Sequence, residues 1–242
     1  MFDGKITGNV HSFQSLGAAD GPGVRSVVFL QGCPLRCAYC HNPDTWEFSG
    51  GEVMSAEQVT DKIKRYKAYF GKEGGVTLSG GEVLMQPAFA TQLLKMCKQE
   101  GIHTAIDTSG AAPIEYAQQV LEFTDLVICD VKFTSEKDYE KFCGGSLERT
   151  LEFLQLCENL DKPFWIRSVI LPGINDNQEF VESLVDLVKG FKNLKKIELL
   201  PFKKMCVTKY EELNIDFPFK DTDECSNDTI IKLSEFIPNH LK

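Results

Sequence analysis

Short apolar runs recur along the chain, and segments with helical periodicity separate them. Runs that are apolar at successive positions are typical of parallel strands covered on both faces, and apolar spacings of three and four predict amphipathic helices. We expect strands at Ser26–Leu30, Gly75–Ser79, His103–Asp107, Leu126–Asp130, Trp165–Leu171 and Lys196–Leu200. We expect helices near Ser55–Tyr69, Gln86–Glu100, Pro113–Phe123, Leu147–Leu160 and Asn177–Gly190.

This alternation predicts an α/β fold of six right-handed βα units, which can form an open sheet or a partial barrel. No linker or repeat marks a boundary, so we expect one domain over residues 1–242, with a core at about 11–202. The segment 203–242 differs in character, because Glu211–Asp228 carries seven acidic residues against one lysine. We interpret it as a solvated surface segment that closes one end of the fold.

Composition excludes several classes of protein. The 242 residues carry a net charge of −9, which disfavours a nucleic-acid partner because such affinity depends on clustered Lys and Arg. Nine cysteines, an odd number, argue against a full disulfide framework, and polar residues among the first ten positions argue against a secretion signal. No run approaches the roughly 18 to 20 apolar residues that span a bilayer. We therefore expect a cytoplasmic protein without a membrane segment.

Three of the cysteines follow the first expected strand at C-x3-C-x2-C spacing: Cys33, Cys37 and Cys40. Three thiolates can hold three irons of a four-iron cluster and leave the fourth iron open to a small molecule. A structural zinc site usually needs four ligands, and His41, adjacent to Cys40, is an awkward fourth. Three buried free cysteines are the remaining alternative, and this spacing at a strand end disfavours it.

Polar residues also stand at the ends of later strands. The turn at Gly80 and Gly81 allows close approach of backbone to a ligand, and Glu82 could accept from a ligand ammonium. A plain strand-to-helix turn is the alternative.

Asp107 and Thr108 end the third strand, and Asp130, Val131 and Lys132 end the fourth. Such groups converge above the carboxyl ends of parallel strands, where they can bind a cation, an ammonium or ribose hydroxyls. Asp107 could instead cap the next helix. Lys132 lies so close to a buried strand that its charge needs a partner.

Arg167 lies inside an apolar strand, where it either pairs within the fold or faces a ligand carboxylate.

The cysteine spacing, with Tyr39 before the last cysteine, resembles the radical S-adenosylmethionine (SAM) superfamily. Further strings resemble the glycyl-radical enzyme activating enzymes of that superfamily. They are Asp20-Gly-Pro-Gly-Val-Arg25, Phe29-Leu-Gln-Gly-Cys33, Cys40-His-Asn-Pro-Asp-Thr-Trp46 and Ser79-Gly-Gly-Glu82. The resemblance implies a partial (β/α)6 barrel and an oxidoreductase that cleaves SAM reductively at a [4Fe–4S] cluster. The 5′-deoxyadenosyl radical then abstracts a hydrogen atom from a backbone glycine of a partner, with pyruvate formate-lyase expected.

The same resemblance assigns residues. Cys33, Cys37 and Cys40 ligate the cluster. The positions expected to contact SAM are Tyr39, Cys40, His41, Gly80, Gly81, Glu82, Asp107, Thr108, Asp130, Val131, Lys132, Arg167 and Lys203. A monovalent cation is expected near Asp107, Thr108 and Asp130. Flavodoxin or ferredoxin is the expected electron donor, and the protein is expected to be a monomer. No side chain need act as an acid or base.

A partner peptide loop must reach the site, and we expect Asp20, Gly21, Pro22, Gly23 and Arg25 to contact it. A type II turn at Pro22 and Gly23 is compatible with that role.

The chain departs from the family at Phe202 and Lys203, where the family has Tyr-His followed by a glycine a few residues later. Two alternatives stay open: a radical SAM enzyme for another glycyl-radical enzyme or a small molecule, and a non-catalytic iron–sulfur or zinc sensor. The sensor hypothesis does not explain the polar residues at the strand ends. The six other cysteines show no paired spacing, and no second cysteine-rich insert follows Cys40, unlike in ferredoxin-bearing relatives.

Overall fold

The computed structural model describes residues 5–242 and divides into two compact units. The first comprises residues 5–34 and 45–128, and the second comprises residues 35–44 and 129–242. Residues 1–4, which entered the argument against a secretion signal, lie outside the described residues. No helix within residues 5–242 has the length and apolar character needed to cross a membrane.

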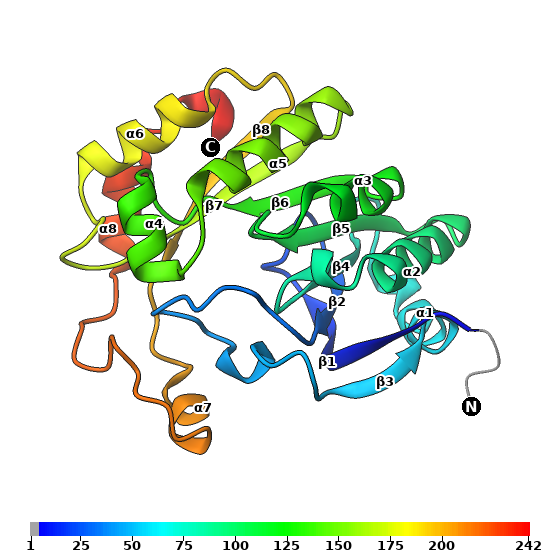
Figure 1. Ribbon diagram of the computed structural model, residues 1–242. Coiled ribbons are helices and arrows are strands. Elements are labelled where there is room, and N and C mark those ends of the chain that lie inside the picture. Colours follow the sequence, from blue (N-terminus) through cyan, green and yellow to red (C-terminus); the bar gives the residue numbers. More distant parts are fainter. Residues whose placement is uncertain (1–4) are drawn as a thin grey trace. The chain divides into compact units, whose positions relative to one another are not determined.

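The first unit is an α/β layer whose strands follow the order β3-β1-β2-β4-β5-β6 (Figure 1). Strands β2, β4 and β5 pair in parallel, whereas β1 is antiparallel to both β2 and β3. Helices α1, α2 and α3 pack side by side. The elements are β1 Thr7–Gly17, β2 Arg25–Leu30, β3 Glu52–Ser55, α1 Ala56–Lys64, β4 Gly75–Gly80, α2 Pro87–Gln99, β5 His103–Thr108, α3 Ile114–Glu122 and β6 Leu126–Asp130, which crosses into the second unit, with 3-10 turns at Lys67–Tyr69 and Val83–Met85.

The second unit continues the strand order as β6-β7-β8, and β7 and β8 pair in parallel. Helices α4 and α5 begin at the side-chain caps Ser135 and Ser146. Helix α4 ends at Gly144, whose left-handed φ of 64° suits glycine. The elements are α4 Glu136–Cys143, α5 Leu147–Asn159, β7 Phe164–Ile170, α6 Gln178–Val188, β8 Leu194–Pro201, α7 Val207–Glu212 and α8 Asn227–Ser234, with 3-10 turns at Asn239–Leu241 and, at the border of the two units, Pro43–Thr45.

The α/β class, the six expected strands and the five expected helices are confirmed, with boundaries that shift mostly by one to three residues. The first expected helix is an exception, because α1 ends at Lys64 and a 3-10 turn follows at Lys67–Tyr69. Strands β1 and β3 were not predicted. Strand β1 is rich in polar residues and mostly half-exposed or exposed, and no helix follows it, so it does not fit a βα unit.

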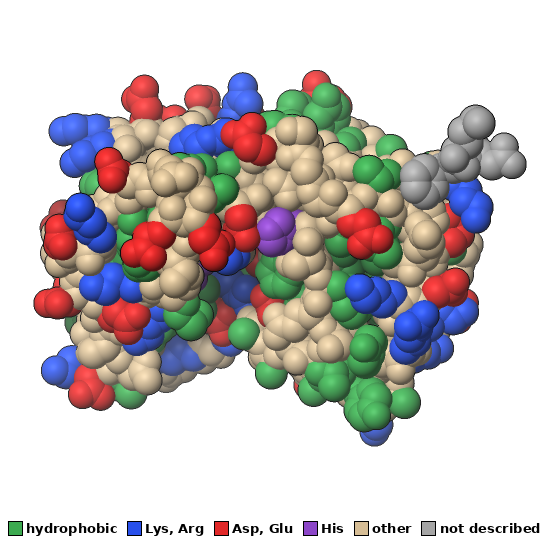
Figure 2. All heavy atoms as spheres, turned by 90° about the horizontal axis from the view of Figure 1, so that it is seen from below, with side chains coloured by type: hydrophobic (Ala, Val, Ile, Leu, Met, Phe, Trp, Pro, Cys, Tyr) green, Lys and Arg blue, Asp and Glu red, His purple; other side chains and the backbone are tan. Residues whose placement is uncertain are grey.

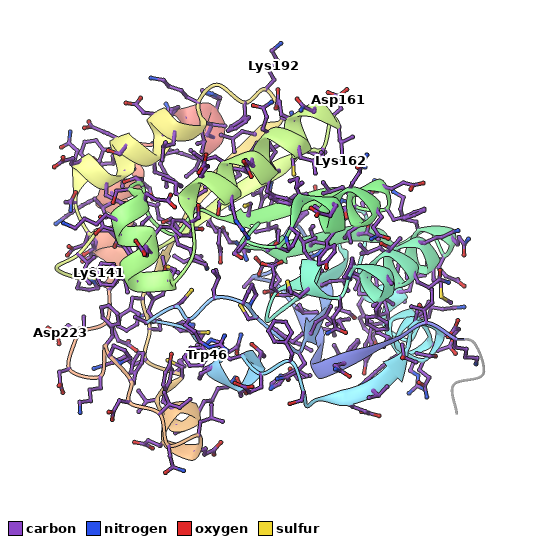
Figure 3. The ribbon with its side chains drawn as sticks, in the orientation of Figure 1. Trp46, Lys141, Asp161, Lys162, Lys192 and Asp223 are labelled. Carbon is purple, nitrogen blue, oxygen red and sulfur yellow. The ribbon has the colours of Figure 1, made fainter. Side chains whose placement is uncertain are left out.

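The segment Glu211–Asp228 is mainly exposed, but three of its apolar residues are anchored in the protein. Phe217, Phe219 and Cys225 in this segment are buried, and the Phe217 ring lies 4.7 Å from that of Tyr210. The acidic side chains between these apolar residues are mainly exposed, as Asp223 shows by pointing outward (Figure 3). The segment therefore alternates anchoring aromatics with solvated charges. Elsewhere too, acidic and basic side chains are interspersed over the face shown in Figure 2.

One tight backbone contact yields a stability prediction. A Cβ at Gly74 would lie 2.0 Å from the carbonyl oxygen of Val24 and 2.4 Å from that of Phe70. Gly74→Ala should therefore lower the free energy of unfolding by about 2–4 kcal/mol, measured by urea denaturation. Gly190 has nothing within 4 Å of such a Cβ, so Gly190→Ala is the matched control and should change it by less than about 1 kcal/mol. Equal effects of the two substitutions would contradict the packing described here.

Candidate functional site

The cysteine loop, residues 35–44, is held by the end of helix α4. The last carbonyls of a helix lack partners within the helix. Here Ala38 N donates to Phe142 O at 2.8 Å and Arg36 N donates to Cys143 O at 2.9 Å. These two bonds fix the backbone on both sides of Cys37 against α4.

Two side-chain anchors hold the second half of this loop. His41 Nε2 donates to the carbonyl oxygen of Lys203 at 2.9 Å, and burial lowers the pKa of the His41 imidazole. Lys209 Nζ, on α7, donates to Asn42 Oδ1 at 2.9 Å and to Asp44 Oδ1 at 3.0 Å. The segment after β8 therefore holds the residues that follow Cys40 through hydrogen bonds.

Aromatic packing surrounds Tyr39, which is only 4% exposed. Its ring meets those of Phe133 and Phe219 edge-on at 6.2 and 6.3 Å, and Phe142 stacks on Phe133 at 5.0 Å. Lys141 on α4 places Nζ 4.5 Å from the centroid of the Phe142 ring (Figure 3). The side chain of Tyr39 thus secures the loop between the two outer cysteines.

Cys37 lies in surroundings that favour its thiolate. A hydrogen bond from the Cys143 thiol, opposed by burial and assisted by the charge of Lys132, lowers the pKa of Cys37 to about 7. The thiolate is the form of cysteine that binds metal. Lys132 Nζ itself lies 2.8 Å from Asp130 Oδ2. Although burial opposes it, Asp130 and the neighbouring acidic groups hold the pKa of Lys132 well above its ordinary value.

Cys33 belongs to the first unit, and its backbone is fixed there. Its N–H donates to Trp46 O at 3.2 Å, and Gly32 N donates to Thr45 O at 2.8 Å. Trp46 (Figure 3) lies just after the cysteine loop, where the chain re-enters the first unit. Gly32 has a φ of 96°, which favours glycine.

The turn after β4 is organised by the Glu82 carboxylate, which is 1% exposed. Its Oε1 accepts from Thr108 Oγ1 at 2.5 Å and from Leu84 N at 3.1 Å. Its Oε2 accepts from Ser109 N at 2.9 Å and Ser109 Oγ at 2.6 Å. Four donors therefore occupy a carboxylate that the sequence assigned to a ligand ammonium, and Glu82 instead ties this turn to the end of β5.

The glycines of this turn are required by their surroundings. Gly80 has a φ of 111°, and a Cβ at Gly81 would lie 2.3 Å from the carbonyl oxygen of Gly32. Close backbone approach leaves main-chain carbonyls, not side chains, to line the turn.

The remaining strand-end residues have partners of their own. Asp107 Oδ2 accepts from Ser79 Oγ at 3.0 Å, and the alternative role of Asp107 as a helix cap is wrong, because α3 begins only at Ile114. Val131 N donates to Arg167 O at 2.9 Å within the second unit. Asp130 belongs to that unit, so the cation site expected between it, Asp107 and Thr108 stays a prediction.

Two cationic residues expected at SAM are engaged by carboxylates. Arg167 is 5% exposed and its Nε donates to Glu198 Oε2 at 2.9 Å, which is the pairing within the fold that the sequence left open. Lys203 Nζ lies 3.3 Å from both Glu224 Oε2 and the carbonyl oxygen of Cys225. Its side chain binds the acidic segment in this structure, and its expected contact with SAM stays a prediction. The backbone carbonyl of Lys203 accepts the hydrogen bond from His41 in the cysteine loop.

Arg25 also needs correction as a partner-contact residue, because its side chain is fully buried. Its guanidinium donates to Thr77 Oγ1 and to Val76 O at 2.7 Å, and to Pro22 O at 3.1 Å. Thr77 Oγ1 donates in turn to Asp20 O at 2.6 Å. Burial lowers the pKa of Arg25 to about 10, so the group stays charged at pH 7. Arg25 supports the 20–23 loop from beneath, and Gly21 and Gly23 adopt positive φ of 122° and 68°.

The donor set fits an iron–sulfur cluster, because each of three cysteine thiolates can bind a separate iron. The lowered pKa of Cys37 and its partly exposed neighbours Cys33 and Cys40 agree with this chemistry.

Sequence reasoning missed several residues that build the site. Asn42 and Asp44 stood inside a quoted motif without a role, whereas no pattern singled out Ser109, Cys143 or Lys209.

Comparison with known proteins gives one family. The description "Radical SAM superfamily" matches residues 27–187. The chain is 43% identical over 238 residues to the pyruvate formate-lyase-activating enzyme of Clostridium pasteurianum, covering 98% of this chain and all of the relative. It is 38% identical over 231 residues to the pyruvate formate-lyase 1-activating enzyme of Escherichia coli K12, covering 90% and 93% of the two chains.

Solved structures agree at the level of fold. A domain of a pyruvate-formate lyase-activating enzyme from Bacteroides vulgatus matches with a TM-score of 0.56 and 25% identity, covering 68% of this chain and 92% of that one. Streptococcus suis SuiB bound to S-adenosylmethionine matches with a TM-score of 0.65 and 15% identity, covering 85% and 44%.

The Glu82 network yields a prediction about stability. Glu82→Ala leaves the buried Thr108 and Ser109 donors without an acceptor, so the free energy of unfolding should fall by about 3 kcal/mol or more, measured by urea denaturation. Glu122→Ala, on the exposed end of α3, should change it by less than about 0.5 kcal/mol. A Glu82 variant as stable as the Glu122 variant would show that these hydrogen bonds contribute little.

The Lys209 anchor yields a prediction about local order. Lys209→Met removes both bonds to the cysteine loop, so backbone amides in 40–44 should exchange hydrogen faster, measured by mass spectrometry. Lys189→Met breaks the exposed ion pair with Asp186 and should leave exchange in this loop unchanged. Unchanged exchange in the Lys209 variant would mean that the loop is held without α7.

Proposed function

Because the chain belongs to the radical SAM superfamily, which implies a [4Fe–4S] cluster and S-adenosylmethionine, we propose that it activates a glycyl-radical enzyme, pyruvate formate-lyase. Similarity to pyruvate formate-lyase-activating enzymes over 98% of the chain is the observation that supports this most strongly. The proposal makes the protein an oxidoreductase whose side chains bind and orient rather than transfer protons.

Cys33, Cys37 and Cys40 would hold three irons of the cluster and leave the fourth to the amino and carboxylate groups of SAM. When bound, the cluster and SAM together supply reductive cleavage of SAM and abstraction of a hydrogen atom from a backbone glycine of the partner. The two α4 carbonyls and the Lys209 anchor fix the loop that carries Cys37 and Cys40, and Cys33 would supply the third thiolate from the first unit. Tyr39, through its aromatic neighbours, and His41, through the Lys203 carbonyl, hold the loop in place.

The other strand ends would receive SAM. The carbonyls of the Gly80–Gly81 turn suit its ammonium, and Glu82 and Thr108 hold that turn in place. Asp107, Asp130, Val131 and Lys132 complete the proposed contacts, with a monovalent cation beside Asp107, Thr108 and Asp130. Arg167 would contribute only through groups other than the Nε that binds Glu198.

The partner peptide would meet the loop at Asp20, Gly21, Pro22 and Gly23, which Arg25 supports from below. We further propose flavodoxin or ferredoxin as the electron donor, a monomeric state and a cytoplasmic location.

The test of this function is anaerobic. The reconstituted, reduced protein is mixed with SAM and pyruvate formate-lyase, and a glycyl radical is sought by electron paramagnetic resonance, with 5′-deoxyadenosine and methionine measured in parallel. We expect the radical signal and both products. Cys37→Ala should abolish the radical signal and both products, whereas Cys157→Ala, at a buried position of α5, should retain them.

Two other results would contradict the proposal. Cleavage of SAM without a glycyl signal on the partner would indicate a different substrate. Cluster binding without any cleavage would indicate a sensor.

A further inference from the structure

Cys143 is a fourth cysteine beside the cysteine loop, and no sequence pattern assigns it a role. It is the last residue of α4 and is completely buried. The bonds from Arg36 N to Cys143 O and from Ala38 N to Phe142 O place its backbone alongside that of Cys37. All of these residues belong to the second unit, so their geometry is internal to it.

The Cys143 sulfur points to the loop. Its thiol hydrogen-bonds to Cys37, and Tyr39 Oη lies 3.8 Å from Cys143 Sγ. A Cys37 that ligates iron does so as a thiolate, which can only accept a hydrogen bond, so the Cys143 thiol is the partner with a proton to donate. Cys97 and Cys157, which are also fully buried, lie instead on the apolar faces of α2 and α5.

We propose that the Cys143 thiol donates a hydrogen bond to the Cys37 sulfur when that sulfur ligates the cluster, and that this bond sets the reduction potential of the cluster. The inference rests on the proposed cluster and deepens it. Reduction adds negative charge that spreads onto the ligand sulfurs. A donor aimed at a ligand sulfur stabilises the reduced state more than the oxidised one, and so raises the potential. Cys143 is thus a positioning and tuning residue, not a cluster ligand.

The experiment compares variants of the full-length, reconstituted protein without any partner enzyme. Cys143→Val removes the donor at similar volume, Cys143→Ser keeps a donor, and Cys157→Val is the matched control at a buried position of α5. The midpoint potential is measured by a redox titration followed by electron paramagnetic resonance. The same spectra report whether the cluster is intact.

We expect the Cys143→Val potential to be more negative, so that the reduced-to-oxidised ratio at a fixed potential falls several-fold. Cys143→Ser should recover most of this ratio, and Cys157→Val should match the wild type. The smaller Cys143→Ala variant gives the same comparison if valine disturbs the packing around Tyr39.

An intact cluster in Cys143→Val and Cys143→Ala with the wild-type potential would overturn the inference. Failure of the proposed function is separate from this, because it would appear in the wild-type protein, as absence of the four-iron cluster, of SAM cleavage or of the glycyl radical.

Discussion

Capping of helix α4 by the cysteine loop is the interaction on which the candidate site depends. The loop has little regular structure of its own, and the helix ends with carbonyls that need donors. The N–H groups of Arg36 and Ala38 satisfy both requirements at once. Since a buried carbonyl without a partner is costly, the fold of the second unit and the position of Cys37 stabilise each other. Tyr39, His41 and Lys209 then fix the remainder of the loop to the segments that follow β6 and β8.

The first unit solves a similar problem with a carboxylate. Strand ends leave polar backbone groups and glycines at the site, and such turns are mobile unless something binds them. Glu82 collects donors from Leu84, Thr108 and Ser109 and so joins two neighbouring strand ends. Polar residues for which the sequence predicts a ligand or partner contact thus also hold backbone: Glu82, Arg25, and Lys203 through its carbonyl. The contacts proposed for SAM are the carbonyls of the Gly80–Gly81 turn and the residues at the ends of β5 and β6.

Sequence was sufficient for the features that depend on local pattern. The βα units follow from apolar runs such as that of β6, and the C-x3-C-x2-C spacing predicts a cluster with one open iron, which stays a prediction. The sequence did not predict features that depend on partners far apart in the chain. Strand β1 has no apolar run, and it is held in the sheet by pairing with β2 and β3, which the sequence pattern does not show. The aromatics of the acidic segment have no periodicity, since each fills a separate gap around Tyr39 or Phe202. Cys143 is separated by about a hundred residues from the cysteine beside it, and no spacing could relate the two.

The central claim is that the thiolates of Cys33, Cys37 and Cys40, the last two on the anchored loop, leave a single iron open to SAM. Mössbauer spectroscopy of protein reconstituted with iron-57 tests it most directly. We expect one of the four irons to differ from the other three and to change its spectrum when SAM is added. Four irons that are equivalent and unaffected by SAM, or a protein that retains zinc in place of iron, would contradict the account.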